Sequence, residues 1–401
     1  MWSGTTVSNS EGVVSETVAS VRQTYPYTLQ PTPDQERTLE AVLWRCRTRD
    51  TGALEQRLTG WRRGQGRAAT RLQQEAELKD LRAAFPEYGA LHSHVLHEVL
   101  ARLDQTYQAF FRRLLNGEKP GVPRFPGRRR SHSFTDKEDG TGARLDTGGV
   151  VLSKIGRMAV RWSGPLAGTP KTVTRSREAD GWSVSCSCAE VPTEPLPPRG
   201  KETGIDVGLQ VLLLTAEGEV VANPRHSRRA EKHLAQAQKR LSRRKKGSKR
   251  REKARRLVAK THQKVRRQRQ DFHHKVALML VRNDDIISLE DLRVAHLVRN
   301  QHLAKSISDA GGGQFRTLLE AKAADAGRHV VAVPPQYTSQ DWSGCGARVA
   351  KSLSVRTPVC PSCGLVLDRD QNAARTILRA GQARRGAVGP PAVVQRASIG
   401  L

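Results

Sequence analysis

Three carboxylates in this sequence stand where an acid is costly to bury. Asp206 lies inside the apolar stretch GIDV, Glu290 ends the apolar run IISLE, and Asp370 directly precedes a predicted helix. An acid with apolar neighbours is unfavourable unless it binds a cation or finds a polar partner. Three carboxylates from separate elements can hold two divalent metal ions about 4 Å apart, which is an arrangement for in-line cleavage of a phosphodiester bond.

Mg²⁺ is the expected ion, because it binds a few carboxylates together with phosphate oxygens. Taken singly, each acid is more simply explained as a solvated strand end or a helix cap. Taken together, on a strongly basic chain, the three acids favour a Mg²⁺-dependent nuclease.

The charge of the chain points to a polyanionic partner. Its 401 residues include 68 Lys and Arg against 39 Asp and Glu, a formal net charge of +29. Nucleic acid is the usual partner of so basic a protein. An anionic membrane is the rival, but the sequence has no run of about 18 apolar residues and no basic amphipathic helix with an aromatic edge. The first residues do not resemble a signal peptide, and six cysteines do not make a disulfide framework in a chain of this length. A cytoplasmic, nucleoid-associated protein of a prokaryotic cell is therefore expected.

Positive charge is densest between residues 227 and 276, where sparse apolar residues predict two long helices around a break at Lys246-Gly247-Ser248. Like charges at this density repel each other unless an anion neutralises them. The residues around the break are therefore predicted to contact nucleic-acid phosphates: Arg243, Arg244, Lys245, Lys246, Lys249, Arg250, Arg251, Arg255 and Arg256.

The remaining elements are predicted to position these groups. A short strand near residue 25 is followed by a helix that Thr32 caps, with Pro33 in its first position. A second helix is predicted over 94–115, strands with alternating apolar residues follow, and a Pro-rich linker at 192–201 marks a domain boundary. Beyond the linker, TGIDVGLQVLLLTAEGEVV predicts a strand hairpin that turns at Glu217-Gly218, and the segments ending at Glu290 and near Val333 predict two more strands.

Several motifs, in this order, resemble the TnpB (OrfB) family of transposon-encoded proteins. They are GIDVGL, ISLEDL, VRNQHLAKSISDAGGGQF, YTSQ, CPSCG and DRDQNAA, and upstream segments extend the resemblance to about residues 21–380. The resemblance implies an RNA-guided DNA endonuclease, related to type V CRISPR effectors, with a guide RNA from the transposon end and double-stranded target DNA as partners. It also implies that Asp206, Glu290 and Asp370 are the catalytic Mg²⁺ ligands. Asp370 matches in preference to Asp368 because it opens the D-x-N-A-A pattern.

The fold implied by the resemblance is a multi-domain α/β protein. A flexible extension is expected at 1–21, then a β-barrel wedge domain at 22–195 with a helical recognition insertion at about 33–116. A RuvC-like nuclease domain of the RNase H type is expected at 202–336 and 367–380. A degenerate zinc ribbon is expected at 337–366 and a disordered tail at 381–401.

The ribbon departs from the family pattern of two C-x-x-C pairs. Cys360 and Cys363 form the second pair, but the first reads WSGC, with Trp342 in place of a cysteine and Cys345 alone. Structural zinc takes four N or S ligands. Three thiolates could bind Zn²⁺ with Asp341, His329 or water as the fourth ligand. Alternatively, zinc is lost and the ribbon is partly unfolded.

Three other functions compete with guided cleavage. A guide-directed, nuclease-inactive DNA-binding protein, repressor-like in its action, would share the fold but is expected to lose a nuclease acid. A transposase that joins DNA ends could use the same acids, yet the motifs do not favour it. A basic RNA-packaging protein would explain the charge but not the acids.

Overall fold

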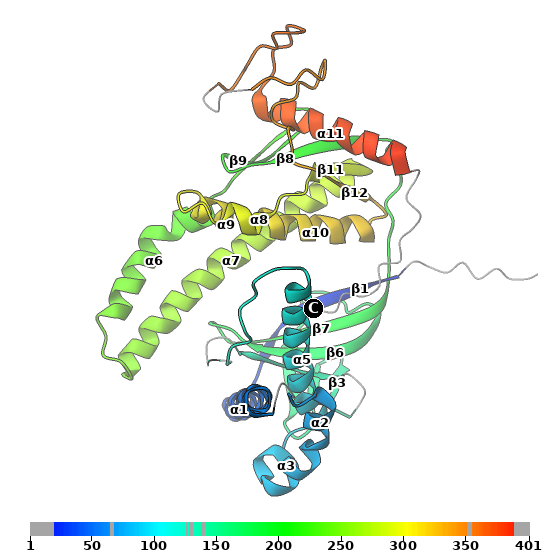
Figure 1. Cartoon of the computed structure of the whole chain (residues 1–401). Coiled ribbons are helices and arrows are strands. Elements are labelled where there is room, and N and C mark those ends of the chain that lie inside the picture. The colour runs from blue at the N-terminus through cyan, green and yellow to red at the C-terminus, as the bar shows by residue number, and fades with distance from the viewer. Residues whose placement is uncertain are drawn as a thin grey trace, which may run out of the picture. The chain divides into compact units, whose positions relative to one another are not determined.

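The computed structural model describes residues 20–64, 68–125, 127, 131–137, 141–350 and 355–388. The chain divides between Thr193 and Glu194 into two compact units (Figure 1). Except for its last two residues, the predicted extension at 1–21 lies outside the described residues.

The first unit contains a nearly closed, barrel-like antiparallel sheet of seven strands in the order β2-β6-β7-β1-β5-β4-β3. Cys186 and Cys188 are fully buried on one face of the long strand β7, as expected of strand residues rather than metal ligands. The strands are β1 (Ser20–Gln30), β2 (Ser133–Lys137), β3 (Ala143–Asp146), β4 (Gly149–Leu152), β5 (Gly156–Arg161), β6 (Thr169–Arg177) and β7 (Trp182–Pro192).

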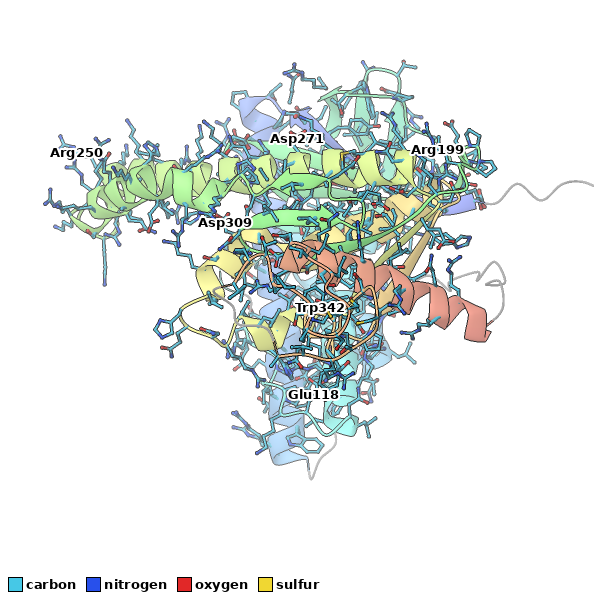
Figure 2. The ribbon with its side chains drawn as sticks, turned by 90° about the horizontal axis from the view of Figure 1, so that it is seen from above. Glu118, Arg199, Arg250, Asp271, Asp309 and Trp342 are labelled. Atoms are coloured by element: carbon cyan, nitrogen blue, oxygen red, sulfur yellow. The ribbon has the colours of Figure 1, made fainter. Side chains whose placement is uncertain are left out.

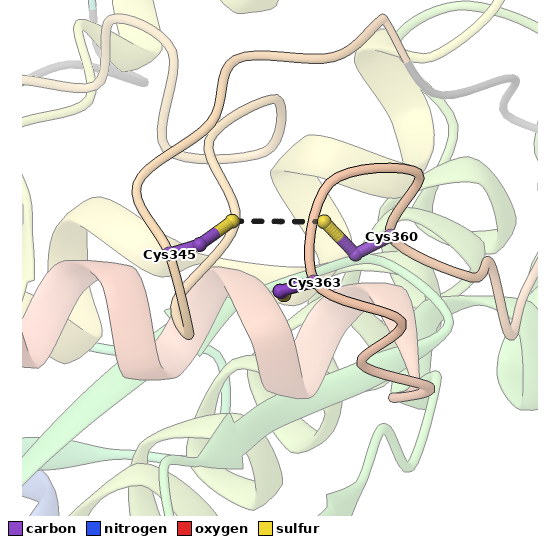
Figure 3. Close-up of side chains that lie close together, drawn as sticks. All are labelled: Cys345, Cys360 and Cys363. Atoms are coloured by element: carbon purple, nitrogen blue, oxygen red, sulfur yellow. Dashed lines mark hydrogen bonds between the residues drawn. The ribbon is translucent and has the colours of Figure 1, made fainter.

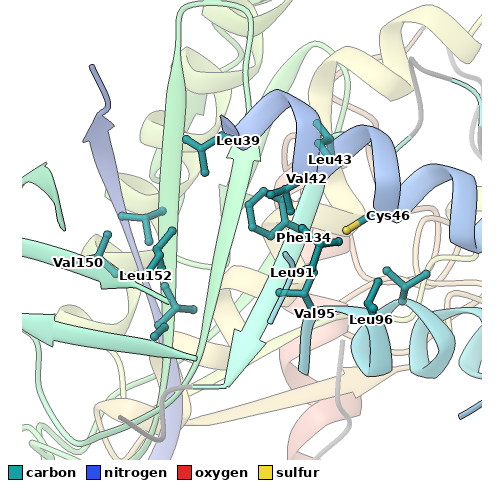
Figure 4. Close-up of a cluster of buried hydrophobic side chains, with 14 of the residues drawn as sticks. Leu39, Val42, Leu43, Cys46, Leu91, Val95, Leu96, Phe134, Val150 and Leu152 are labelled. Carbon is teal, nitrogen blue, oxygen red and sulfur yellow. The ribbon is translucent and has the colours of Figure 1, made fainter. Parts of the chain in front are cut away.

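Among the described residues, five helices lie between β1 and β2. The first begins as predicted: Thr32 caps it, its side chain accepts from the N–H of Gln35, and Pro33 follows. Apolar side chains of the first and last helices pack with strand residues in one core, which contains Leu39, Cys46, Leu96 and Phe134 (Figure 4). The helices are α1 (Pro33–Arg63), α2 (Arg71–Ala76), α3 (Leu78–Ala84), α4 (Pro86–Gly89) and α5 (Ser93–Leu115).

The second unit is built on a mixed sheet of five strands in the order β10-β9-β8-β11-β12. Strands β8, β11 and β12 are parallel, and β9 and β10 run antiparallel to their neighbours. The strands are β8 (Glu202–Val207), β9 (Val211–Thr215), β10 (Val220–Ala222), β11 (Ile286–Glu290) and β12 (His329–Val333). The predicted two-stranded hairpin is therefore wrong: the chain turns at residues 208–210 and again near Gly218, so the segment forms three strands.

Helices cover both faces of this sheet. Apolar side chains of α7 and α10 pack with Ile205, Ile287 and Leu289 on one face, and α11 lies on the other. The helices are α6 (His226–Ser242), α7 (Lys249–Asn283), α8 (Val294–Leu297), α9 (Ala304–Ala310), α10 (Gly312–Asp325) and α11 (Arg369–Val388). In the part of the chain that the structure describes, no helix is long and apolar enough to cross a membrane.

The expected disordered tail at 381–401 is wrong for its first residues, because α11 continues to Val388. A Cβ at position 381 would lie only 2.0 Å from Ser288 Oγ, so Gly381 allows the helix to lie directly against β11. Arg385 then forms an ion pair with Glu202 at the start of β8. The remainder of the predicted tail, 389–401, lies outside the described residues.

Candidate metal centre and nucleic-acid interface

Two of the three predicted acids are brought together by strand register. Strands β8 and β11 are parallel, and Leu289 is paired with Ile205. Asp206 and Glu290 each follow one of these residues, so they are neighbours at the carboxyl ends of adjacent strands. Because side chains alternate along a strand, both acids point away from the face that carries Ile205 and Leu289.

The third acid is carried to the same place by α11, which runs antiparallel to β8. Near its C-terminal end Arg385 contacts Glu202, and in its middle Ala374 lies against Gly204, where a Cβ would approach the Ala374 carbonyl oxygen to 2.2 Å. Asp370 is one helical turn before Ala374, and Asp206 is two residues beyond Gly204 on the same face. Glycine at position 204 is therefore required for the helix to bring Asp370 to the strand ends.

The charges of the other two acids act on Asp206. Burial, and after it the negative charges of Glu290 and Asp370, together raise the pKa of Asp206 to about 7. Burial also raises the pKa of Glu290, which a hydrogen bond donated by the Thr338 hydroxyl partly offsets. Negative charge is thus concentrated at one edge of the sheet, where a cation would relieve the repulsion.

Asp370 and Asp368 have different roles. The Asp368 carboxylate accepts hydrogen bonds from the N–H groups of Asp370 and Gln371 at 2.9 and 3.1 Å, so it caps α11. The Asp370 carboxylate instead forms ion pairs with Arg356 at 2.8 Å and Arg369 at 3.1 Å. The charge of Asp370 raises the pKa of Asp206 more than the charge of Asp368 does, and Asp368 holds the helix start.

The basic segment forms a helical hairpin, as predicted, with α6 and α7 joined by a turn at 243–248 (Figure 1). Ser248 caps α7 and Gly247 has a φ of +84°, a conformation that suits glycine. Arg250 lies near the tip (Figure 2). The side chains of six predicted residues are exposed there: Arg243, Arg244, Lys245, Lys246, Lys249 and Arg250.

The other three predicted contacts are partly used within the hairpin. Arg251 donates to the carbonyl oxygens of Leu241 and Arg244 at 3.0 and 2.7 Å, and so fastens the end of α6 to the start of α7. Arg255 and Arg256 both lie within ion-pair distance of Glu252. The exposed positive charge that makes no contact within the hairpin is therefore concentrated between Arg243 and Arg250.

Sequence reasoning missed the residue that fixes the base of the hairpin. The carboxylate of Asp309, at the end of α9, accepts hydrogen bonds from the N–H groups of Ser227 and Arg228 in the first turn of α6. It is largely buried. Its contact is 82 residues distant in sequence, and only its position within the motif VRNQHLAKSISDAGGGQF could have singled it out.

The three ribbon cysteines lie together (Figure 3). Their sulfur atoms are all within 4.8 Å of one another, and Cys345 Sγ is 3.7 Å from Cys360 Sγ. Burial acts to raise the pKa of the Cys360 thiol, but hydrogen bonds from the N–H groups of Cys363 and Ser362 and contacts with the other thiols leave it below its ordinary value. Cys360 therefore favours the thiolate, the form that binds metal. The hydrogen bond from the Leu365 N–H acts to lower the pKa of Cys363, but hydrogen bonds with the Cys360 and Cys345 thiols outweigh it and leave that pKa raised.

The surroundings of the cluster correct two of the predicted fourth ligands. Among the described residues, neither Asp341 nor His329 belongs to it. The Asp341 carboxylate instead pairs with Arg348 at 2.8 Å, and His329 begins strand β12.

The ribbon contains two copies of one backbone turn. Trp342 stands in the first copy at the position that Cys360 occupies in the second. The N–H of Cys360 donates to Leu365 O, and the N–H of Gly364 donates back to Cys360 O. The N–H of Trp342 likewise donates to Ala347 O, and that of Gly346 donates back to Trp342 O. Gly346 and Gly364 have matching φ values of +75° and +71°. The two turns therefore share one backbone pattern, with a tryptophan, 1% exposed, where the other has Cys360.

Comparison with known proteins agrees with this architecture. The family profile OrfB_IS605, described as a probable transposase, matches residues 185–301, and that of the Cas12f1-like TNB domain matches 313–377. A protein of Streptomyces pristinaespiralis, named "Putative RNA-guided DNA endonuclease", is 36% identical over 373 residues, which cover 90% of each chain. The chain belongs to the TnpB (OrfB) family.

Other relatives support the same assignment to TnpB. The Escherichia coli K12 protein named "Putative RNA-guided DNA endonuclease InsQ" is 30% identical over 309 residues, covering 73% of this chain and 75% of the relative. A cryo-EM structure of a Cas12f1–sgRNA–target DNA complex superposes with a TM-score of 0.55 at 14% identity, over 86% of this chain and 83% of that one. At this identity the likeness concerns the fold.

Proposed function

We propose that this TnpB-family chain is an RNA-guided, Mg²⁺-dependent DNA endonuclease of an insertion sequence, with a guide RNA from the transposon end and double-stranded DNA as its target. The proposal is carried by Asp206 and Glu290, which are neighbours at the carboxyl ends of β8 and β11, and by Asp370, whose charge acts on Asp206 from the first turn of α11. The strand order, with a three-stranded antiparallel half continued by two parallel strands, supports a RuvC-like domain of the RNase H type.

The acids fit magnesium. Asp206 has a raised pKa because it is buried beside two other carboxylates, and a divalent cation would favour its charged form. When bound, Mg²⁺ would supply an activated water and neutralise charge that develops on the phosphate. The chain's own contribution is to hold the acids: strand register sets Asp206 beside Glu290, Thr338 orients Glu290, and α11 brings Asp370.

The ribbon fits zinc incompletely. Three thiolates supply three of the four ligands that a structural zinc site takes, and water is the remaining candidate for the fourth. Zinc would tie the two turns together. Asn372 already fastens the first turn to α11, because its side chain accepts from the Ser343 N–H and donates to Asp341 O.

Base pairing with the guide would select the target, while the exposed positive charge would contact phosphates without reading sequence. Reversal of charge at Arg243, Arg244, Lys245 and Lys246 should therefore weaken nucleic-acid binding at least about tenfold and reduce the slope of log affinity against log salt by about 3 to 4. Binding measured across a salt series checks both values.

Lys275→Glu provides a control on α7, beyond the turn, because Lys275 is paired with Asp271 and should contribute little. The variant with four reversed charges should lose the same affinity for every target sequence. Loss restricted to some sequences would mean that the hairpin tip reads bases.

Sequencing of the RNA that co-purifies with the protein tests the guided function directly. A single defined RNA that overlaps the end of its own gene is expected. A heterogeneous RNA population would instead indicate non-specific binding, which the charge alone could produce.

A second candidate is guide-directed DNA binding without cleavage. It is favoured by the ion pairs of Asp370 with Arg356 and Arg369, because two guanidinium groups compete with a metal ion for this carboxylate. Incubation of the purified protein with guide, target and Mg²⁺ separates the two functions. Binding of the target without strand breaks would favour the second.

A further inference from the structure

A cluster of two histidines and an aspartate lies in the first unit, apart from the three acids and the cysteines. His92 immediately precedes α5, His94 is in its first turn, and Asp136 is on β2. One possible ligand atom from each lies within 4.8 Å of the other two. The Asp136 side chain is 5% exposed, and those of His92 and His94 are 16% and 30% exposed.

The distances suit a small metal ion. Ligand atoms of a tetrahedral zinc site with bonds of about 2.0–2.1 Å lie about 3.3 Å apart. His92 Nδ1 is 3.2 Å from Asp136 Oδ1, and His94 Nδ1 is 3.9 Å from the same oxygen. Small rotations of the two rings would therefore complete three corners of such a site. The fourth corner would be open to water beside His94, the most exposed of the three.

Two local features indicate that the fold leaves room for the three side chains and directs His92 toward Asp136. Gly142 is buried against them, and a Cβ there would lie 2.4 Å from Asp136 Oδ1 and 2.9 Å from His92 Nδ1. His92 also stands at the N-cap of α5, where Ser, Thr, Asp or Asn is preferred, yet its side chain makes no capping hydrogen bond. Its ring is directed to Asp136 instead.

The rival explanation is purely electrostatic. Burial lowers the pKa of Arg175 to about 10, and the charge of Asp136 acts in the opposite direction. Asp136 could therefore serve only as a counter-ion for this buried guanidinium, with the histidines as hydrogen-bonding neighbours. That explanation accounts for the burial of Asp136. It does not explain why two imidazoles, one of them at the N-cap of α5, lie close to the same carboxylate oxygen.

We propose that His92, His94 and Asp136 bind a divalent transition-metal ion, Zn²⁺ by ligand type, which fastens the first turn of α5 to strand β2. Neutral imidazole nitrogens with one carboxylate oxygen are a common zinc ligand set. The ion would therefore join the helical insertion to the barrel-like sheet of the same unit.

Zinc titration of the full chain tests this site. The protein carries Cys345→Ser, Cys360→Ser and Cys363→Ser, so that the thiolates do not contribute, and is stripped of metal with a chelator. Calorimetry with ZnCl₂ should then give one equivalent at micromolar affinity or tighter. His92→Ala and His94→Ala should each weaken binding at least about tenfold.

His97→Ala is the matched control, because His97 is on the same helix one turn further and lies 3.6 Å from Glu75 rather than beside Asp136. It should bind zinc as the parent does. A parent that takes up no zinc, or His92 and His94 variants that bind as tightly as the control, would overturn the proposal.

A second measurement covers the case in which a histidine variant fails to fold. Co²⁺ added to the serine-substituted parent should give weak visible bands without the intense near-ultraviolet bands of thiolate ligation, and Zn²⁺ should raise the melting temperature by several degrees. No change in either measurement would equally exclude the site.

Discussion

Asp206→Ala, Glu290→Ala and Asp370→Ala should each reduce DNA cleavage at least about 10³-fold, while binding of guide and target changes little. In the proposed function each acid is a metal ligand, and the charges of Glu290 and Asp370 both act on Asp206. Loss of a metal ligand removes several kcal/mol of transition-state stabilisation. Binding relies on exposed basic groups elsewhere in the chain. Single-turnover kinetics measure the loss of cleavage, and a binding assay on the same preparations measures whether guide and target binding is retained.

Asp368→Ala is the matched control, two residues before Asp370. Its carboxylate caps α11, so its removal should cost about 1 kcal/mol of stability and reduce cleavage far less than loss of Asp370. An essential Asp368 beside a dispensable Asp370 would show that the third ligand has been assigned to the wrong residue.

Local chemistry made several parts of this fold predictable. Thr32, Pro33 and Gln35 lie within four residues of one another, and the capping box that they predict is confirmed. The turn between α6 and α7 could also be predicted from the sequence, because a glycine follows a run of helix-forming basic residues. The strand predicted to end at Glu290 is also confirmed. It could be predicted because its apolar run stops at that acid.

The parts that could not be predicted depend on contacts between distant segments. Nothing near Gly381 shows that α11 continues through it, because the reason is the close approach of Ser288, far away in sequence. The pairing of β8 with β11 sets Asp206 beside Glu290, and an apolar pattern does not specify which strands become neighbours. The turn after Val207 was missed because the apolar residues on both of its sides read as one strand.

The ribbon illustrates both what the sequence could predict and what it could not. The sequence identified Trp342 as the residue in place of a cysteine, but it left open whether the segment folds. The structure has two turns with the same hydrogen bonds, and the first of them is attached to α11 through Asn372. A buried tryptophan therefore occupies the position at which a thiolate would bind metal.

Trp342→Cys should convert the three-thiolate cluster into a four-thiolate zinc site. In addition to any zinc at His92, His94 and Asp136, the unmodified protein is expected to hold less than one zinc per chain in the ribbon, and the variant to hold one there and to bind it at least about tenfold more tightly. Loss of the buried indole costs about 3–5 kcal/mol when zinc is absent, so the variant should be less stable than its parent in chelator and regain stability with Zn²⁺. Elemental analysis and melting curves with and without chelator measure both effects.

Trp342→Ser separates the two consequences, because it removes the same bulk without supplying a thiolate. It should be destabilised in chelator like the cysteine variant and should not be rescued by zinc. A full zinc equivalent in the ribbon of the unmodified protein, lost when Cys345, Cys360 and Cys363 are replaced by serine, would show that water already completes the site. Because Asn372 joins the first turn to α11 two residues after Asp370, the zinc-free cysteine variant should also cleave DNA more slowly than its zinc-loaded form. Equal rates in the two forms would mean that the order of the ribbon does not determine how firmly the third acid is held.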